Sequence, residues 1–422
     1  MHYPNSKTIH RHVLPNGITI LAYENFANES VVIEGLVRAG SIADPVGQEG
    51  LASFTASTLM RGTAKRDFHE IYDDLESVGA DLHISSSKHS TDFGAGCLVE
   101  DVGLILDLLA NALRYPTFPP EQVEKQRGQI MTGLTIRAND TRQMATLAFN
   151  KLLYPHHPYG RSSRGHKQTI DTITASDLRH FHTNYYSPHG MIIAVVGAVK
   201  AETAVSQIAQ VFEDWQPGKK LTIEKVGPQE RPLSTQRTHI NMADKTQADI
   251  ILGLPGPPRA APDYLQASLM NTILGVFGMM GRIGKTVREE QGLAYYAYSA
   301  LQGGLGPSPW SASAGVAPEL VEQAIHSILA EIQRIQTEPV TAEELADSKA
   351  YRLGSLPVSL ETNSGLAGVI IDMELYHLSL DYITEFSQKI KAITIEQIQA
   401  AAQKYLSTEQ IAIAVAGPNI TR

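Results

Sequence analysis

Tyr295 follows Arg288 by seven positions, and the two side chains together could act on a substrate. A guanidinium and a phenol hydroxyl held in place can stabilise the negative oxygen of a tetrahedral intermediate, or hold a peptide backbone. The charged neighbours of Arg288 instead favour a solvated helix end. These neighbours are Lys285, Glu289 and Glu290. The residues alone therefore leave two alternatives, a stabilising pair or a solvated helix end followed by a core tyrosine.

A second stretch, residues 49–63, is informative because of the side chains that it lacks. Small and apolar residues lead into a predicted helix that ends at Arg61-Gly62-Thr63. The inverted zinc motif H-x-x-E-H would place two metal-binding histidines on one helix face, with a glutamate as general base. This chain has Ser53, Ala56 and Ser57 at those positions. Because these side chains neither bind zinc nor take a proton from a zinc-bound water molecule, we predict no zinc site here.

Histidines elsewhere are numerous but do not predict a metal site. The six that fall within 34 residues are His156, His157, His166, His180, His182 and His189. None of them has a carboxylate or cysteine partner at convincing ligand spacing, so surface or structural roles are favoured. The single cysteine, Cys97, lies in an apolar strand pattern and is predicted to be an inert core thiol.

The composition is that of a globular protein. The chain has 422 residues, of which 43% are hydrophobic and 19% charged. A formal charge of −9 argues against nucleic acid as a partner. The first residues show no apolar leader and no later run is long enough to span a bilayer, so we expect no membrane partner and a cytoplasmic location.

The chain contains an internal repeat. Residues 173–197 and 393–417 align without a gap at an offset of 220. Eight aligned pairs are identical: Ile173/Ile393, Thr174/Thr394, Tyr185/Tyr405, Ser187/Ser407, Ile193/Ile413, Ala194/Ala414, Val195/Val415 and Gly197/Gly417. Each copy predicts a Thr-capped helix, a turn, and an apolar strand closed by glycine. We therefore predict two homologous domains of mixed helix and strand, 1–215 and 233–422, joined by a Pro- and Gly-rich linker over 216–232.

Short segments in a fixed order resemble the pitrilysin and mitochondrial-processing-peptidase family of zinc metallopeptidases, in particular its short, two-domain members. These segments are His12–Ile18, Arg38–Ser41, Gly50–Ala52, Tyr154–Gly160, Tyr186–Pro188, Val195–Gly197, Leu254–Pro257 and Val287–Tyr295. The resemblance implies an α+β fold of two similar α/β domains, each a mostly antiparallel sheet packed by helices. Some family members divide the catalytic residues between two chains, and this chain resembles the subunit that lacks H-x-x-E-H.

The resemblance also implies roles for particular residues. The family's third zinc ligand, a glutamate on a later helix, corresponds to Gly133, so this chain is expected to bind no metal. Arg288 and Tyr295 correspond to an Arg/Tyr pair that reaches the zinc site of a homologous partner, where the zinc is expected. The adjacent Tyr296 is an alternative to Tyr295 as the acting tyrosine.

Three glycines, Gly275, Gly278 and Gly281, precede the Arg288 segment. The segment that they begin, residues 275–286, nearly matches the phosphate-binding motif G-x-x-x-x-G-K-T at its end, but that motif requires glycine where Met279 stands, so nucleotide binding is rejected. The resemblance suggests a glycine-bearing turn that lines a substrate path. Close packing of the backbone is an equally good explanation.

We therefore expect a non-catalytic subunit of a heterodimeric zinc metallopeptidase that acts on peptides. Its partner would be a homologous subunit with an intact H-x-x-E-H motif. The alternative is a structural or peptide-binding protein of the same fold with no role in catalysis.

Overall fold

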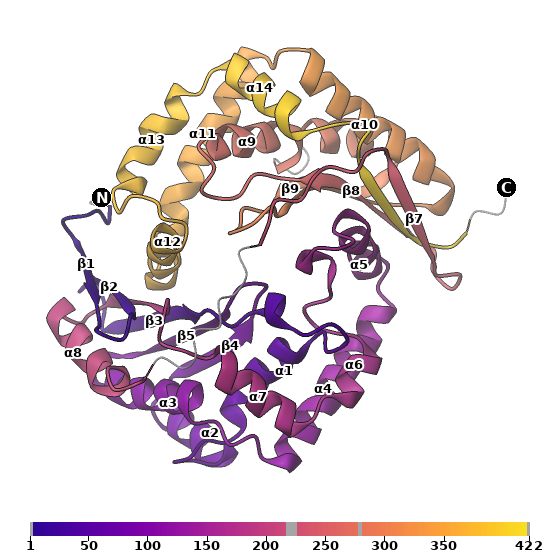
Figure 1. Ribbon diagram of the computed structural model, residues 1–422. Helices are drawn as coiled ribbons and strands as arrows, with labels where there is room; N and C mark the ends of the chain where they lie inside the picture. Colours follow the sequence, from indigo (N-terminus) through magenta and orange to yellow (C-terminus); the bar gives the residue numbers. More distant parts are fainter. Residues whose placement is uncertain (1–2, 217–225, 277–280, 420–422) are drawn as a thin grey trace. The chain divides into compact units, whose positions relative to one another are not determined.

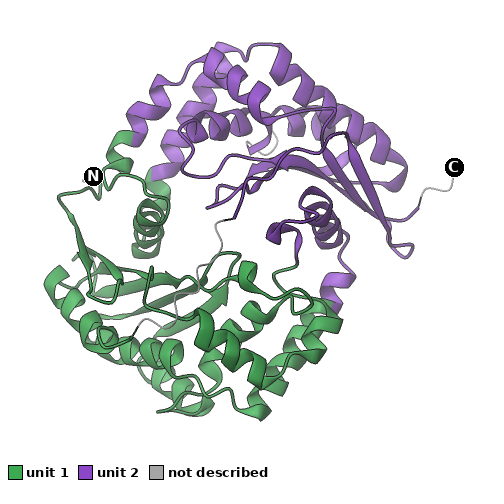
Figure 2. Cartoon of the chain, in the orientation of Figure 1, with its two compact units in different colours: residues 1–134, 162–224, 357–385 green, residues 135–161, 225–356, 386–422 purple. Residues whose placement is uncertain are grey.

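The computed structural model describes residues 3–216, 226–276 and 281–419, and the chain forms two compact units (Figures 1 and 2). Unit 1 comprises residues 1–134, 162–224 and 357–385. Unit 2 comprises residues 135–161, 225–356 and 386–422. Each unit is thus assembled from three separate stretches of the chain.

Unit 1 is built on a six-stranded sheet with the strand order β1-β2-β6-β3-β5-β4. The strands are β1 (Ile9–Val13), β2 (Thr19–Glu24), β3 (Ser30–Val37), β4 (Asp81–Ser86), β5 (Thr91–Leu98) and β6 (Ile192–Gly197). Only β2 and β6 pair in parallel; the other neighbours are antiparallel. The central strand β6 is apolar and fully buried, whereas β4, at one edge, alternates polar residues outward.

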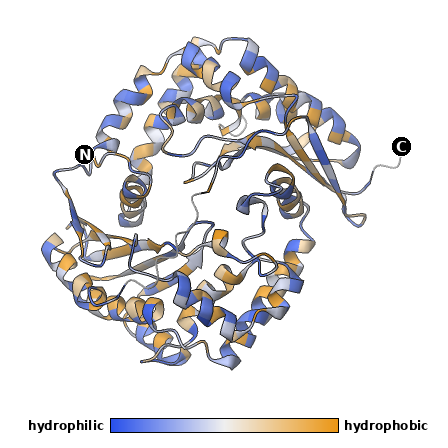
Figure 3. Ribbon diagram, in the orientation of Figure 1, coloured by the Kyte–Doolittle hydropathy of each residue, from blue (hydrophilic) through white to orange (hydrophobic). Residues whose placement is uncertain are grey.

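Helices cover both faces of this sheet. The unit contains α1 (Leu51–Thr58), α2 (Phe68–Ser77), α3 (Val102–Arg114), α4 (Pro120–Ala138), α6 (Lys167–Thr172), α7 (Ala175–Tyr185), α8 (Ala201–Phe212) and α12 (Asn363–Leu375), with short 3-10 turns η1 (Ser41–Ala43), η2 (Leu59–Arg61) and η3 (Val99–Asp101). Helix α12 packs on β3 and β6, on the face opposite α3 and α7 (Figure 1). The helices alternate apolar and polar stripes, as Figure 3 shows, because only their inner faces are buried.

Unit 2 is built on a five-stranded sheet with the order β7-β11-β8-β10-β9. The strands are β7 (Gln236–Asn241), β8 (Ala248–Pro255), β9 (Ala294–Leu301), β10 (Pro309–Val316) and β11 (Ala412–Gly417). The three central strands β8, β10 and β11 are buried along their whole length, which requires cover on both faces. Helix α5 (Thr141–Leu153) packs on β7, β8 and β11, and α10 (Val321–Thr337) packs on β8 and β10 (Figure 1).

The remaining elements complete unit 2 or pass between the units. Within unit 2 lie η4 (Pro158–Gly160), α9 (Tyr264–Asn271), the π-helical segments η5 (Thr272–Val276) and η6 (Gly284–Glu290), η7 (Pro318–Leu320) and α14 (Ile395–Tyr405). The chain passes from one unit to the other within α4, α11 (Ala342–Ser359) and α13 (Tyr382–Ala392). In the described ranges no helix is both long and apolar enough to cross a membrane.

The repeat appears as two matching helix-turn-strand pairs, α7 with β6 and α14 with β11. Thr174 and Thr394 cap their helices in the same way, each accepting a hydrogen bond from the backbone three residues on. Ser187 and Ser407 both accept a backbone N–H in the turn that follows, each at 3.2 Å. These features confirm the local prediction, and the two mostly antiparallel sheets packed by helices confirm the predicted fold class.

Each half of the chain supplies one helix that packs on the sheet of the other unit. Helix α5 lies between elements of unit 1 in the sequence but covers the sheet of unit 2, and α12 lies between elements of unit 2 but covers the sheet of unit 1 (Figure 2). The domain boundaries predicted from the repeat, 1–215 and 233–422, remain a prediction about the two homologous halves. Residues 217–225 of the predicted linker lie outside the described residues.

Candidate functional site

Helix α1 begins at a glycine in a left-handed conformation, Gly50, whose φ is +97°. The buried carboxylate of Asp44 accepts hydrogen bonds from the backbone N–H groups of Gly50 and Ala52, both at 2.8 Å. A negative charge at this end of a helix is favoured by the unpaired N–H groups and by the helix dipole. Asp44 and Gly50 thus fix the start of α1.

The side chains at the zinc-motif positions of α1 carry no metal-binding group. Ala56 is buried, and Ser53 and Ser57 are half-buried. The hydroxyl of Ser57 donates to the carbonyl of Phe54 at 3.0 Å, and Thr58 donates to the same carbonyl at 2.7 Å. Ser57 is therefore bonded to the backbone of its own helix, as serine in a helix often is.

Helix α4 carries Gly133, the position predicted to correspond to the family's third zinc ligand, and two of its side chains reach α1 and the turn after it. The Arg127 guanidinium stands 5.3 Å from the centre of the Phe54 ring, and Arg61 donates to the side chains of Gln126 and Gln129 at 2.8 and 3.0 Å. Gly133 is exposed on α4, and a Cβ atom added there would meet nothing within 4 Å. Packing therefore does not require glycine at this position.

The described part of the chain holds no group of three or more His, Cys, Asp or Glu side chains placed to bind a metal ion. One histidine of the cluster, His182, donates from Nε2 to the carbonyl of Leu113 at 2.9 Å, and its burial lowers its pKa. His157 accepts a backbone N–H from Tyr159 at 3.1 Å. These two histidines have structural roles, as predicted.

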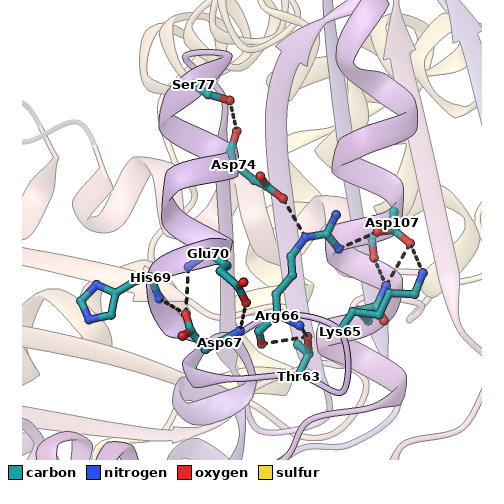
Figure 4. A network of polar contacts seen from close by, with 10 residues as sticks. Thr63, Lys65, Arg66, Asp67, His69, Glu70, Asp74, Ser77 and Asp107 are labelled. Carbon is teal, nitrogen blue, oxygen red and sulfur yellow. Dashed lines mark hydrogen bonds and ion pairs between the residues drawn. The ribbon is translucent and has the colours of Figure 1, made fainter.

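The segment that leaves α1 is held by a polar network (Figure 4). Arg66 donates to Asp74 at 2.7 Å and to Asp107 at 2.6 Å, and Lys65 reaches Asp107 at 2.8 Å. Burial raises the pKa of Asp107, but the hydrogen bonds and charges of Lys65 and Arg66 outweigh it and lower that pKa. Asp67 caps α2. The network ties the exit of α1 to α2 and α3.

Arg288 and Tyr295 both lie in unit 2 and both are exposed. Arg288 is near the end of η6, and Tyr295 is the second residue of β9 with 82% of its surface exposed. Within the described ranges, neither side chain forms a hydrogen bond or an ion pair. The alternative in which Tyr295 fills a core is therefore wrong.

Tyr295 stands on a β-bulge. Ala294 pairs with Val316 and Tyr296 pairs with Gly315, so Tyr295 is an extra residue between two successive pairs. A bulge redirects a side chain and is common at sheet edges and beside active sites. Strand β9 is at the edge of its sheet, next to β10. The bulge therefore presents Tyr295 on the edge strand of its sheet.

The segment η6 is anchored from both ends, which fixes the backbone that carries Arg288. At its start, the 6% exposed Arg282 makes a two-bond ion pair with Glu344 of α11, at 2.7 and 2.9 Å. Burial raises the pKa of Glu344, but its bonds to Arg282 and to the Thr341 N–H outweigh this and lower the pKa to about 2. Two hydrogen bonds then join this segment to α10. The Thr286 hydroxyl donates to the Glu331 carboxylate at 2.9 Å, and the Ser327 hydroxyl donates to the side-chain oxygen of Gln291 at 2.8 Å.

Two of the three glycines predicted to line a substrate path are needed for packing. A Cβ on Gly275 would lie 2.4 Å from the backbone nitrogen of Ser299 in β9, and a Cβ on Gly281 would lie 2.8 Å from Gly275 Cα. Both contacts are closer than real Cβ atoms allow. Gly278 lies outside the described residues. The packing explanation thus holds for Gly275 and Gly281, and a substrate-path role remains a prediction.

The neighbouring tyrosine, Tyr296, is occupied elsewhere. Its hydroxyl donates to the carboxylate of Asp249 in β8, while Arg142 of α5 donates to the hydroxyl of Tyr298. Sequence reasoning did not identify Asp249 or Arg142. The available signal was a single acidic residue inside the otherwise apolar run 248–255, because a buried carboxylate must have partners.

Family models match most of the chain. Residues 20–165 match a model described as insulinase, peptidase family M16, and residues 172–351 match a model described as the peptidase M16 inactive domain. Among curated proteins, an uncharacterized zinc protease of Streptomyces coelicolor is 24% identical over 97% of this chain and 90% of its own length. A probable mitochondrial-processing peptidase subunit beta of Arabidopsis thaliana is 22% identical over 96% of this chain and 77% of its own length.

Solved structures agree in fold. A crystal structure described as the peptidase M16 inactive domain of Pseudomonas fluorescens superposes with a TM-score of 0.91 and 27% identity, over 98% of both chains. A protease from Helicobacter pylori gives the same TM-score with 19% identity, over 97% of this chain and 99% of its own. The similarity therefore extends over both units.

Proposed function

Because the chain belongs to peptidase family M16, we propose that it is the non-catalytic subunit of a heterodimeric zinc metallopeptidase. The partner would be a homologous chain with an intact H-x-x-E-H motif, and its substrates would be peptides or unfolded segments. One observation carries the proposal. The same molecule lacks metal-binding side chains on α1 and at Gly133 of α4. It also exposes Arg288 and Tyr295, with no partner among the described residues, on a firmly anchored segment and a bulge.

In this proposal the two exposed side chains act as hydrogen-bond donors. When bound by the partner, zinc would polarise the peptide carbonyl and activate a water molecule. The Arg288 guanidinium and the Tyr295 hydroxyl would donate to the oxygen on which negative charge develops, or hold the substrate backbone beside it. Removal of one such donor typically costs about 3 kcal/mol of transition-state stabilisation, roughly a hundredfold in rate.

An extended peptide suits the surroundings of Tyr295. Strand β9 borders its sheet and leaves one row of backbone groups without a neighbouring strand in the described residues. A peptide can add to such an edge through main-chain hydrogen bonds, with every second side chain directed to one face. This geometry supports recognition of backbone over recognition of one particular side chain.

The first test uses the purified chain alone. We expect it to retain no zinc by metal analysis and to cleave no fluorogenic peptide, because α1 offers no ligand. Robust zinc-dependent cleavage by the lone chain would contradict the proposal.

The second test adds a homologous H-x-x-E-H subunit, which we expect to restore turnover. Arg288→Ala should then lower kcat/KM about a hundredfold. Lys285→Ala is the matched control, since it removes one positive charge from the same segment. Lys285 is exposed, and within the described residues its side chain has a 3.9 Å contact to Glu290 and no other ion pair. Equal activity of both variants would favour the alternative, a structural or peptide-binding protein in which the pair takes no part in catalysis.

A further inference from the structure

A buried carboxylate in unit 2 gathers side chains from three elements. Asp249, in the middle of the sheet on β8, is 2% exposed. It accepts hydrogen bonds from the hydroxyls of Tyr296 on β9 and Thr141 on α5, and more weakly from Gln247 at 3.3 and 3.4 Å. A buried carboxylate is stable only with such donors, so the cluster has one well-defined arrangement.

A glycine makes the contact between β8 and β9 possible. The two strands are not adjacent, because β10 lies between them, and Gly315 of β10 pairs with Asp249 on one side and Tyr296 on the other. A Cβ on Gly315 would lie 2.5 Å from the Tyr296 ring and 2.7 Å from the amide nitrogen of Gln247. The Tyr296 side chain therefore crosses β10 over the glycine to reach the carboxylate.

Helix α5 contributes a second residue, Arg142, which contacts the two tyrosines. The guanidinium of Arg142 stands 5.0 Å from the centre of the Tyr296 ring and 5.3 Å from that of Tyr298, and it donates to the Tyr298 hydroxyl. Cation–π contact with both rings holds these tyrosines on the same face of β9. The positive charge also lies close to the buried carboxylate, which it stabilises.

The cluster lies directly beside the bulge. The Tyr296–Gly315 pair is the last regular pair before the register shifts, and the extra residue is Tyr295. A bulge interrupts the regular alternation of side chains, so the direction of Tyr295 depends on where regular pairing stops. The contact of Tyr296 with Asp249 fixes the Tyr296–Gly315 pair beside the extra residue, and Tyr295 is 82% exposed there. Without that contact, Tyr295 and Tyr296 could exchange their places through a one-residue slip of the edge strand.

We propose that Asp249, Gly315 and Tyr296 form a latch across three strands that fixes the bulge and so presents Tyr295, and that Arg142 holds the latch closed. These are positioning residues and do not touch substrate. The inference rests on the proposed function, in which Tyr295 is the acting tyrosine. It adds the reason why the acting residue is Tyr295 and not Tyr296.

The test has a part that needs no partner protein. In the purified chain, Tyr296→Phe removes only the hydroxyl that binds Asp249, and we expect amide hydrogen exchange in the peptide 293–301 to rise by about tenfold, the loss of one hydrogen bond. Tyr23→Phe, in β2 of the other unit, is the matched control and should change nothing in that peptide. Circular dichroism checks that both variants are folded. Unchanged exchange in a folded Tyr296→Phe variant would overturn the latch.

The second part measures turnover with the H-x-x-E-H subunit. We expect Tyr295→Phe to lower kcat about a hundredfold and Tyr296→Phe about tenfold, with KM within about twofold in each case. Since the latch acts only through Tyr295, the double variant should be no slower than Tyr295→Phe alone. Additive losses would mean that Tyr296 acts independently and would overturn the inference.

The two parts separate this inference from the proposed function. If Tyr295→Phe lowers kcat and Tyr296→Phe does not, the latch is wrong and the proposed function stands. If neither variant nor Arg288→Ala affects kcat, the proposed function is wrong, and the positioning role falls with it even where the exchange result holds.

Discussion

Glu344→Gln should destabilise unit 2 through the ion pair that anchors η6. The carboxylate of Glu344 accepts two hydrogen bonds from the buried Arg282 and one from the Thr341 N–H at 2.8 Å. Glutamine keeps the shape but has a single acceptor oxygen and no charge. A guanidinium that is 6% exposed is then left without its counter-charge.

The size of the effect follows from the pKa of Glu344, which falls from 4.5 to about 2. At about 1.4 kcal/mol for each tenfold change in proton affinity, the carboxylate contributes on the order of 3 kcal/mol to the free energy of unfolding. That figure is an upper value, because 27% of the Glu344 side chain is exposed and water screens part of the interaction. We therefore expect a loss of about 2–3 kcal/mol at neutral pH.

The sign of the pH dependence is fixed by the direction of the shift. Because the pKa is lower in the folded state, the contribution of Glu344 is complete above its ordinary pKa of 4.5 and is lost as the pH falls from there towards 2. The free energy of unfolding of the wild-type protein should thus approach that of Glu344→Gln across that interval. The difference between the two proteins should be constant between pH 6 and pH 8.

Urea unfolding followed by tryptophan fluorescence measures this difference. The chain has two tryptophans, of which Trp310 is fully buried in β10. A Trp215→Phe background leaves Trp310 as the sole reporter, and it reports on unit 2. The control is Glu338→Gln, whose pair with Arg334 is exposed and should be worth less than about 1 kcal/mol. A loss from Glu344→Gln no larger than the control's, or one that does not change between pH 5 and pH 3, would refute the reasoning.

Three further predictions concern other parts of the chain. Arg66→Met should lower the stability of unit 1 by about 1–2 kcal/mol in urea unfolding, since it breaks two partly buried ion pairs; an unchanged midpoint would contradict this. Burial, with Asp101 and Asp81 nearby, raises the pKa of the Cys97 thiol to about 12, so iodoacetamide at pH 8 should label the native chain far more slowly than the urea-unfolded chain. Equal labelling rates would refute it. Helix α5 lies in the first half of the chain but covers the sheet of unit 2, and α12 lies in the second half but covers the sheet of unit 1. Fragments 1–216 and 226–422 should therefore be insoluble alone but copurify when coexpressed. A monomeric, folded single fragment would show that this exchange of helices is dispensable.

Local structure was predictable wherever a short run of residues determines it. The Thr174 and Thr394 caps, the helices that follow them and the apolar strands ending at Gly197 and Gly417 could all be identified from the sequence. Each of these features depends on contacts within a few residues. The sheet to which a helix is added is a different matter. Nothing in the sequence of α5 or α12 indicates that each covers the sheet of the other half.

The glycines illustrate the same limit. Gly275, Gly278 and Gly281 could be singled out because glycine is unusual in a helical pattern. Their sequence could not separate a substrate path from close packing. For Gly275 the deciding atom is the backbone nitrogen of Ser299, and that residue lies on another element.

The sequence by itself determined the family and the absence of histidine, cysteine and carboxylate side chains on α1, because the identity of a side chain does not depend on the fold. The assignment of Ser53, Ala56, Ser57 and Gly133 to zinc-site positions stays a prediction from the resemblance. Only the tertiary structure distinguished Tyr295 from Tyr296. The two are adjacent and chemically identical, and they differ only through a bulge opposite Gly315 and a carboxylate two strands away. Such contacts join residues that are distant in the chain, so they exist only once the sheet has formed.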